Sequence, residues 1–270
     1  MKRFHTIIAV AALLFAACDK IEPGQYTLGT GSSSEWENAN ARRAFVEKYT
    51  GPKCANCPRA DVTLDAAHHR FGDKLVIISV NHPTGQGVPF AGEPDLRTED
   101  GTAWSQYLGI SELPSAYLNR GSKQYTGSMD DILADIESAV AETPLAGIEV
   151  AATADGNDIA ITVDVELYSQ IDGGLTVTLA LTEDSLVYKQ SMPEGEPQDD
   201  YVHNHMLRDV ITDTWGNELP FAGTAGEHKV GHFSYTLGNS DIRLENCHVV
   251  ALLSRKDTRA VINCAECDIQ

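Results

Sequence analysis

Two cysteines separated by two residues, in the segment Cys54-Ala55-Asn56-Cys57-Pro58, are the residues of this sequence best suited to chemistry. Such a pair cycles between dithiol and disulfide, and a thiolate of the pair attacks disulfides of other proteins. The same spacing also serves a permanent structural disulfide or half of a zinc site. Zinc needs four ligands, and no second cysteine pair lies nearby in the sequence. The pattern therefore favours thiol–disulfide exchange, with a structural disulfide as the alternative.

The flanking residues place the pair at a corner between a strand and a helix. Residues 44–49 alternate as a strand does, a turn follows, and a helical face is marked by Ala60, Leu64, Ala67 and Phe71. At or beside the helix start, Cys54 meets unsatisfied N–H groups and the positive end of the helix dipole, and Lys53 adds a cation. We expect Cys54 to be the nucleophile and Cys57, one turn in and less exposed, to be the resolving cysteine.

The charged residues before the corner are candidates for tuning the cysteines. Lys53 is assigned an electrostatic role, and Glu47, in the preceding strand, a role in proton transfer. Lys48 stands one residue closer to the cysteines. An exposed or salt-bridged carboxylate is the alternative for Glu47.

The next segment resembles thioredoxins. A nearly continuous apolar run over residues 74–80 predicts a strand buried on both faces of a sheet. Residues 101–111 predict a short helix that leads to Pro114 and a new strand at 116–118. In thioredoxins the matching proline has a cis peptide bond and lies against the cysteine pair. The resemblance implies that Pro114 belongs to the site and that Leu113 presents its backbone to an extended substrate.

A strand at 123–125 and a helix starting at Ser128 complete the expected unit. Ser128 and Asp131 form a candidate capping box, and Pro144 ends the helix. Residues 44–143 therefore predict an α/β thioredoxin-like domain.

After residue 144 the helical period disappears. Apolar residues alternate with polar ones over 159–167 and again over 175–181. This alternation predicts antiparallel strands with one face exposed to solvent. With further strands toward the C-terminus, residues 144–270 predict an all-β sandwich, immunoglobulin-like in class. Three cysteines lie in the expected last hairpin, and a structural disulfide from Cys247 to Cys264 or Cys267 is our first interpretation of them.

His203 and His205, two residues apart, are candidate metal ligands. An extended backbone would put both rings on one side, and Asp199, Asp200 and Asp209 could add oxygen ligands. No third ligand has a spacing typical of a metal site. We therefore expect a hydrogen-bonded loop or sheet contact here, with no metal and no cofactor.

The N-terminus predicts export. Lys2 and Arg3 precede an apolar run, and small residues precede Cys18, as in a bacterial lipoprotein signal. Residues 1–17 are the expected signal peptide, Cys18 the lipid-modified residue, and 18–43 a flexible tether. Outside the cytoplasm, disulfides persist.

Composition excludes some partners. The chain of 270 residues has 20 Lys and Arg against 39 Asp and Glu, a formal charge of −19, and 42% hydrophobic residues. Enough apolar surface exists for a core, whereas no basic patch exists to neutralise phosphates. Nucleic acid is therefore an unsuitable partner, and the expected membrane contact is through lipid.

Two signatures together, residues 50–58 (TGPKCANCP) and 201–208 (YVHNHMLR), resemble the outer-membrane-protein twenty-eight family. The resemblance implies an outer-membrane lipoprotein of anaerobic Gram-negative bacteria, on the periplasmic face or the cell surface. The expected function is disulfide exchange with, or binding of, extracytoplasmic proteins or peptides. A surface adhesin or receptor that uses the thioredoxin fold as a scaffold is the alternative, and a metal or haem carrier is a third class.

Overall fold

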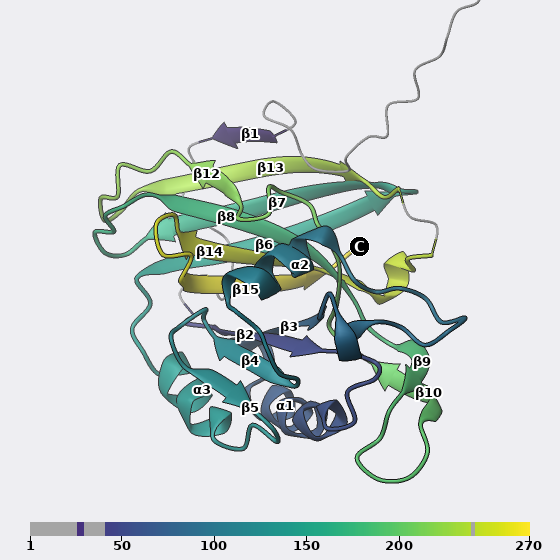
Figure 1. Ribbon diagram of the computed structural model, residues 1–270. Coiled ribbons are helices and arrows are strands. Elements are labelled where there is room, and N and C mark those ends of the chain that lie inside the picture. The colour runs from purple at the N-terminus through teal and green to yellow at the C-terminus, as the bar shows by residue number, and fades with distance from the viewer. Residues whose placement is uncertain (1–25, 30–40, 239–240) are drawn as a thin grey trace, which may run out of the picture.

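The computed structural model describes residues 26–29, 41–238 and 241–270 (Figure 1). The predicted signal peptide and the lipidated Cys18 lie outside these residues. Part of the predicted tether is structured, which corrects the expectation of a wholly flexible segment. Strand β1 (Tyr26–Gly29) pairs antiparallel with β13 (His228–Thr236). An edge strand offers unpaired N–H and C=O groups to any extended segment, and β13 is covered in this way.

The first half is a mixed α/β unit. Its elements, in chain order, are β2 (Ala44–Thr50), α1 (Cys57–Phe71), β3 (Leu75–Asn81), α2 (Glu99–Tyr107), β4 (Ser115–Leu118), β5 (Gln124–Thr126) and α3 (Ile132–Val140). Short 3₁₀ turns lie at Gly72–Lys74 and Gly85–Gly87. β2 is parallel to β3 and antiparallel to β4, and β4 pairs with β5. The predicted strand and helix order is confirmed, although α3 begins at Ile132 rather than Ser128, with no side-chain cap.

Two apolar layers cover the two faces of this sheet, because alternate residues of a strand point to opposite faces. Ala44 and Val46 pack with residues of α1 and α3, whereas Phe45 and Tyr49 pack with Trp104 of α2. Figure 1 shows α1 and α3 below β2, on one side of the sheet.

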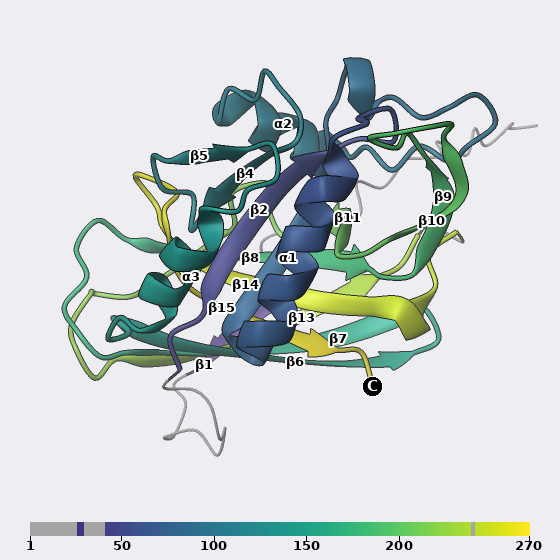
Figure 2. The same cartoon turned by 90° about the horizontal axis from the view of Figure 1, so that it is seen from below.

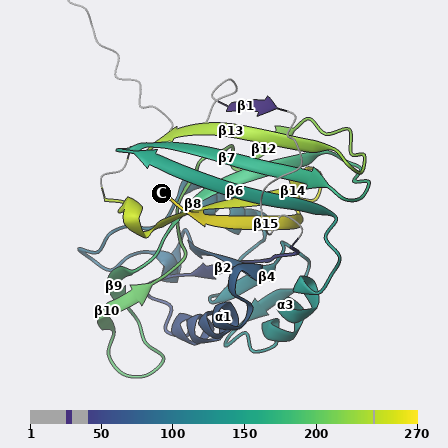
Figure 3. The same ribbon diagram turned by 180° about the vertical axis from the view of Figure 1, so that it is seen from behind.

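The second half is β-rich. Its strands are β6 (Ala146–Asp155), β7 (Asp158–Leu167), β8 (Leu175–Glu183), β9 (Leu186–Gln190), β10 (Gln198–His203), β11 (Met206–Val210), β12 (Asn217–Leu219), β13, β14 (Cys247–Arg255) and β15 (Val261–Asp268), with a 3₁₀ turn at Leu244–Asn246. A sheet of order β1-β13-β7-β6 stacks on β8, β14 and β15, and an apolar core fills the space between the two layers (Figure 3).

One sheet runs through both halves, although the sequence predicts two separate domains. Its order is β15-β14-β8-β11-β3-β2-β4-β5, with β12 paired to β8. Strand β11 makes the junction: it is antiparallel to β8 and parallel to β3, where Met206 is the partner of Ser79. Without β11, the edge of β3 would expose unpaired backbone groups. The expected boundary at residue 144 therefore falls between two parts of the chain that share a sheet.

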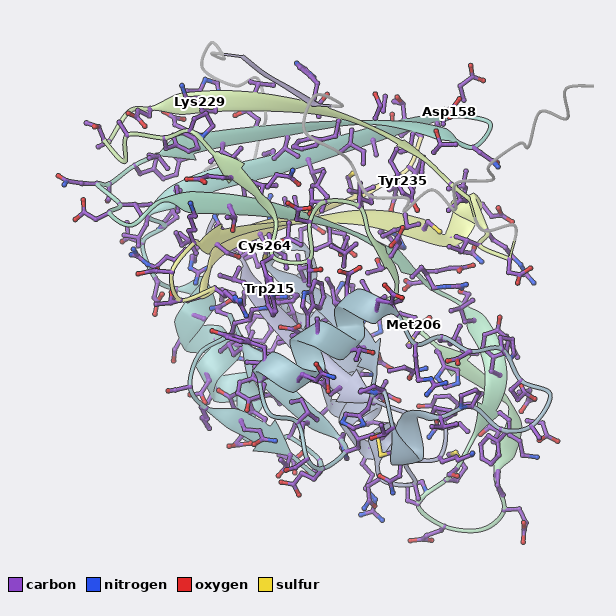
Figure 4. The ribbon with its side chains drawn as sticks, turned by 45° about the horizontal axis from the view of Figure 1, so that its top comes forward. Asp158, Met206, Trp215, Lys229, Tyr235 and Cys264 are labelled. Atoms are coloured by element: carbon purple, nitrogen blue, oxygen red, sulfur yellow. A yellow bond between two sulfur atoms is a disulfide. The ribbon has the colours of Figure 1, made fainter. Side chains whose placement is uncertain are left out.

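A shared core reinforces the shared sheet. Phe45 and Trp104 of the first half belong to the same buried cluster as Val250 and Cys264 of the second. Figure 4 labels Trp215 and Cys264 in the layer between the α2 helix and the strands of the second half. The structure thus joins an α/β part to a β-rich body through both hydrogen bonds and apolar contact.

Candidate functional site

The two cysteines of the corner form a disulfide. Cys54 and Cys57 are joined through their sulfurs, and each residue is 1% exposed. A turn precedes the helix, because Cys54 N donates to Gly51 O at 3.0 Å and Cys57 N to Cys54 O at 3.2 Å. Helix α1 begins at Cys57, so Cys57 opens the helix rather than lying one turn inside it, and it is as buried as Cys54. Pro58 fits the first turn, whose N–H groups have no intrahelical acceptor.

The peptide bond between Leu113 and Pro114 is cis. Strand β4 starts at Ser115, which is the register partner of Tyr49 near the end of β2. Pro114 therefore lies at the same end of the sheet as the turn that carries Cys54. The cis peptide bond that the thioredoxin resemblance implies for this proline is the bond found.

A hairpin from the second half covers the corner. Gln190, at the end of β9, is 2% exposed, and its Nε2 donates to Cys54 O at 2.9 Å and to Gly51 O at 3.3 Å. The next residue, Ser191, donates its backbone N–H to Pro52 O at 2.8 Å. Figures 1 and 2 show the β9–β10 hairpin at the end of the sheet where β2 ends and α1 begins. A residue 136 positions away in the chain therefore holds the backbone of Cys54.

The loop between β3 and α2 covers the other side of the same turn. Lys53 N donates to Gln86 O at 3.0 Å. A Cβ on Gly51 would lie 2.4 Å from that same Gln86 oxygen, so only glycine permits this approach. The Lys53 ammonium lies 5.6 Å from the ring centroid of Phe90, which belongs to the loop. The cation expected to tune Cys54 is thus held beside an aromatic ring of the covering loop.

Glu47 is fully buried and paired. Its carboxylate accepts from Arg120 Nε at 2.7 Å and from Tyr49 Oη at 2.8 Å. Burial, followed by the neighbouring Glu47 charge, raises the pKa of Tyr49 well above its ordinary value. The salt-bridged alternative for Glu47 is the arrangement found, and Arg120 was not anticipated because it lies 73 residues away in the sequence.

Buried Lys48 and partly buried Asp61 form a second ion pair, on the other face of β2. The Lys48 ammonium contacts the Asp61 carboxylate, which also accepts from Tyr201 Oη at 2.7 Å. Burial first, and Asp61 second, raise the pKa of Tyr201 far above its usual range. Asp61 is four residues after Cys57 on α1, so the two occupy one helix face. That spacing was the only signal in the sequence for Asp61.

His203 and His205 do not assemble a metal site. His203 ends β10, whereas His205 has φ 57°, so the backbone between them is not extended. Asp199 pairs with Lys189, and Asp209 accepts from Tyr235, both away from the histidines. Within residues 41–238 and 241–270, no group of three His, Cys, Asp or Glu residues is arranged to hold a metal ion. Burial lowers the pKa of each histidine to about 4.

The three C-terminal cysteines are free thiols. Cys264 is the register partner of Leu252 and Cys267 that of Val249, whereas Cys247 pairs with Glu183 of β8. No cross-strand partner of a cysteine is therefore another cysteine, which corrects the expected bridge. Burial raises the pKa of all three thiols to about 12.

The sequence match to known families decides the identity. The Omp28 outer membrane protein family matches residues 101–270, which is more than half of the chain. The chain belongs to the Omp28 family. Its localisation at the outer membrane, predicted from the sequence, is confirmed by this membership. In the described part of the chain, no helix is sufficiently long and apolar to cross a membrane.

Several solved structures are similar in fold to this Omp28 chain. HBP35 of Porphyromonas gingivalis is 16% identical, with a TM-score of 0.67 over 85% of this chain and 76% of that one, and it supports the fold. Protein AGR_C_4864 from Agrobacterium tumefaciens is 16% identical with a TM-score of 0.49, over 84% of this chain and 94% of that one. A domain of the outer membrane lipoprotein Omp28 from Porphyromonas gingivalis is 19% identical with a TM-score of 0.34, over 48% and 91%. No curated protein matches the sequence.

Proposed function

We propose that this Omp28 protein exchanges disulfides with extracytoplasmic proteins or peptides through Cys54 and Cys57. The observation that carries the proposal is the Cys54–Cys57 disulfide at the β2–α1 corner, with the cis Pro114 at the same end of the sheet. A disulfide that opens a helix places its sulfurs where N–H groups and the helix dipole stabilise a thiolate.

The proposed reaction needs only the Cys54–Cys57 disulfide and a substrate dithiol. A substrate thiolate attacks Sγ of Cys54, the bond to Cys57 breaks, and Cys57 leaves as a thiolate that takes up a proton. A second substrate thiolate attacks the substrate sulfur of the mixed disulfide and releases Cys54. Two electrons pass from the substrate dithiol to the protein disulfide, and the reverse sequence reduces a substrate disulfide. Leu113, before the cis bond, is the proposed backbone contact for an extended substrate, and Lys53 is the proposed tuning group.

A scaffold function is the second candidate, and a specific observation favours it. Both cysteines are 1% exposed, and Gln190 covers the backbone of Cys54. Under this alternative the disulfide braces the corner permanently, and the protein acts as an adhesin or receptor.

Insulin reduction and refolding of reduced ribonuclease, both with a soluble form that starts at residue 19, separate the two functions. We expect catalysis by wild type and by Cys267→Ser, whose thiol lies outside the corner, and its loss in Cys54→Ser. Catalysis absent from wild type, or equal in Cys54→Ser, would contradict exchange and support the scaffold.

Lipid attachment at Cys18 is a separate proposal, supported by the small residues before it and by membership of an outer membrane family. Mass spectrometry of the detergent-extracted protein tests it. We expect acyl chains on an N-terminal Cys18, and an unmodified protein in Cys18→Ala.

We also propose the finer division of the chain into a thioredoxin-like unit at 44–143 and an immunoglobulin-like sandwich at 144–270. The two stacked β-layers of the second half support it. An experimental structure tests the assignment through the strand connections, and connections that lack a Greek key would contradict it.

A further inference from the structure

A small polar chamber lies between the two halves, apart from the disulfide. Its walls come from β2, α1 and β3 of the first half and from residues 201–206 of the second. The chamber has a volume of about 30 Å³. Its polar walls are Lys48, Asp61, Asp65, Ser79, Tyr201, His203, Asn204 and His205. Met206, which lines it as well, is labelled in Figure 4.

Three buried polar atoms at this chamber make no hydrogen bond to the described protein groups: Ser79 Oγ, His203 Nε2 and His205 Nδ1. Ser79 is 0% exposed. His205 Nδ1 lies 3.6 Å from Asp184 Oδ1, which is beyond hydrogen-bonding distance. A buried polar group without a partner destabilises the fold, so three such atoms on residues that line one chamber point to a ligand.

The chemistry of the walls defines that ligand. The His203 ring hydrogen-bonds the Tyr188 backbone, which leaves Nε2 as an acceptor, because burial keeps this imidazole neutral at pH 7. The Ser79 hydroxyl both donates and accepts. The Lys48 ammonium on the wall repels a cation. Asp61 already neutralises Lys48, and Asp65 adds a second carboxylate, so the walls attract no anion. A neutral molecule that donates and accepts hydrogen bonds fits these walls.

The volume of the chamber limits the size of the ligand. A cavity holds a water molecule when about 10–15 Å³ is open to the water's centre, and a buried water makes about three hydrogen bonds. The chamber offers about 30 Å³ and three unpartnered atoms. We propose that it is a binding site for one or two ordered water molecules, which join Ser79 of β3 to His203 and His205.

This site holds the two halves together at the strand junction. Ser79 is the register partner of Met206, and Ser79 N donates to His205 O at 2.7 Å. The bound water adds side-chain links beside this backbone contact. It also fixes the end of β10, in the hairpin that carries Gln190. The water site does not depend on disulfide chemistry.

A crystal structure of the soluble form at about 1.5 Å resolution tests the proposal. We expect spherical density in the chamber, about 2.7–3.2 Å from Ser79 Oγ and His203 Nε2. An empty chamber, direct contact between these side chains, or density larger than water would overturn it. Anomalous signal at that position would also overturn it in favour of a metal.

Nitrogen-15 NMR of the histidines tests the same site in solution. We expect the His203 Nε2 resonance to carry the shift of a neutral nitrogen that accepts a hydrogen bond, and Ser79→Ala to move it toward the free-acceptor value. Thr162→Ala, beside the exposed His232, is the matched control and should leave His203 unchanged. A free-acceptor shift in wild type contradicts a bound water.

Discussion

Gln190 Nε2 lies 2.9 Å from the carbonyl oxygen of Cys54 and connects the β-rich body to the disulfide corner. The same amide donates to Ser191 O at 3.1 Å, so it ties its own hairpin to the corner. The backbone of the disulfide corner is therefore held by a polar side chain. A hydrogen-bonded cover opens at the expense of a few hydrogen bonds, and water replaces them once it is open.

Replacement of Gln190 by alanine should expose the disulfide. A buried hydrogen bond stabilises by about 1 kcal/mol, so we expect Gln190→Ala to speed reduction by dithiothreitol up to about tenfold. Gln198→Ala is the matched control, because Gln198 is exposed and is the register partner of Gln190 across the hairpin. Equal reduction rates for the two variants would show that the hairpin does not limit access.

Removal of one partner of the Glu47–Arg120 pair should destabilise the fold strongly. Both side chains are at most 1% exposed, and removal of one partner of such a pair costs about 3–5 kcal/mol because a buried charge is left alone. We therefore expect Arg120→Met to lower the free energy of unfolding in urea by that amount. Arg70→Met, which breaks the exposed pair with Glu137, should cost less than about 1 kcal/mol. A smaller loss in Arg120→Met than in Arg70→Met contradicts the prediction.

The one disulfide and the three free cysteines predict how many thiols react with a thiol reagent. In the soluble form that starts at residue 19, burial and raised pKa values protect Cys247, Cys264 and Cys267. We expect no rapid reaction of the native protein with Ellman's reagent at pH 8. Unfolding without reductant should release three thiols, and prior reduction should add the two of the disulfide. A single thiol after unfolding would indicate a second disulfide among the three.

His248 should make stability depend on pH in the alkaline range. Its hydrogen bond with Asp184 raises its pKa to about 9 against an ordinary value of about 6.5. Because the folded pKa is the higher one, the stabilisation is complete below pH 6.5 and is lost as pH rises through 9. We expect His248→Gln to lose roughly 1–2 kcal/mol at pH 6 and little at pH 10, after allowance for solvent screening.

Chemical denaturation at both pH values measures this effect. His232→Gln is the control, since His232 is an exposed histidine whose ring contacts Thr162. A His248→Gln loss that is the same at pH 6 and pH 10 would show that the Asp184 contact does not depend on charge.

The sequence by itself determined the local features. The Cys54–Cys57 spacing, the strand before it and the helix after it follow from periodicity and from turn residues, which act over a few positions. The alternation over residues 159–167 predicted β7 in the same way. Family membership follows from the match over residues 101–270, which is a property of the sequence, so it required no tertiary information.

Only the tertiary structure decided what surrounds those features. The cover by Gln190, the Arg120 partner of Glu47 and the junction of β11 with β3 join residues far apart in the chain. A single sequence carries no signal for such pairs, because periodicity reports which face is buried and not what it meets. The three free C-terminal cysteines follow from strand register, which the packing of both faces sets.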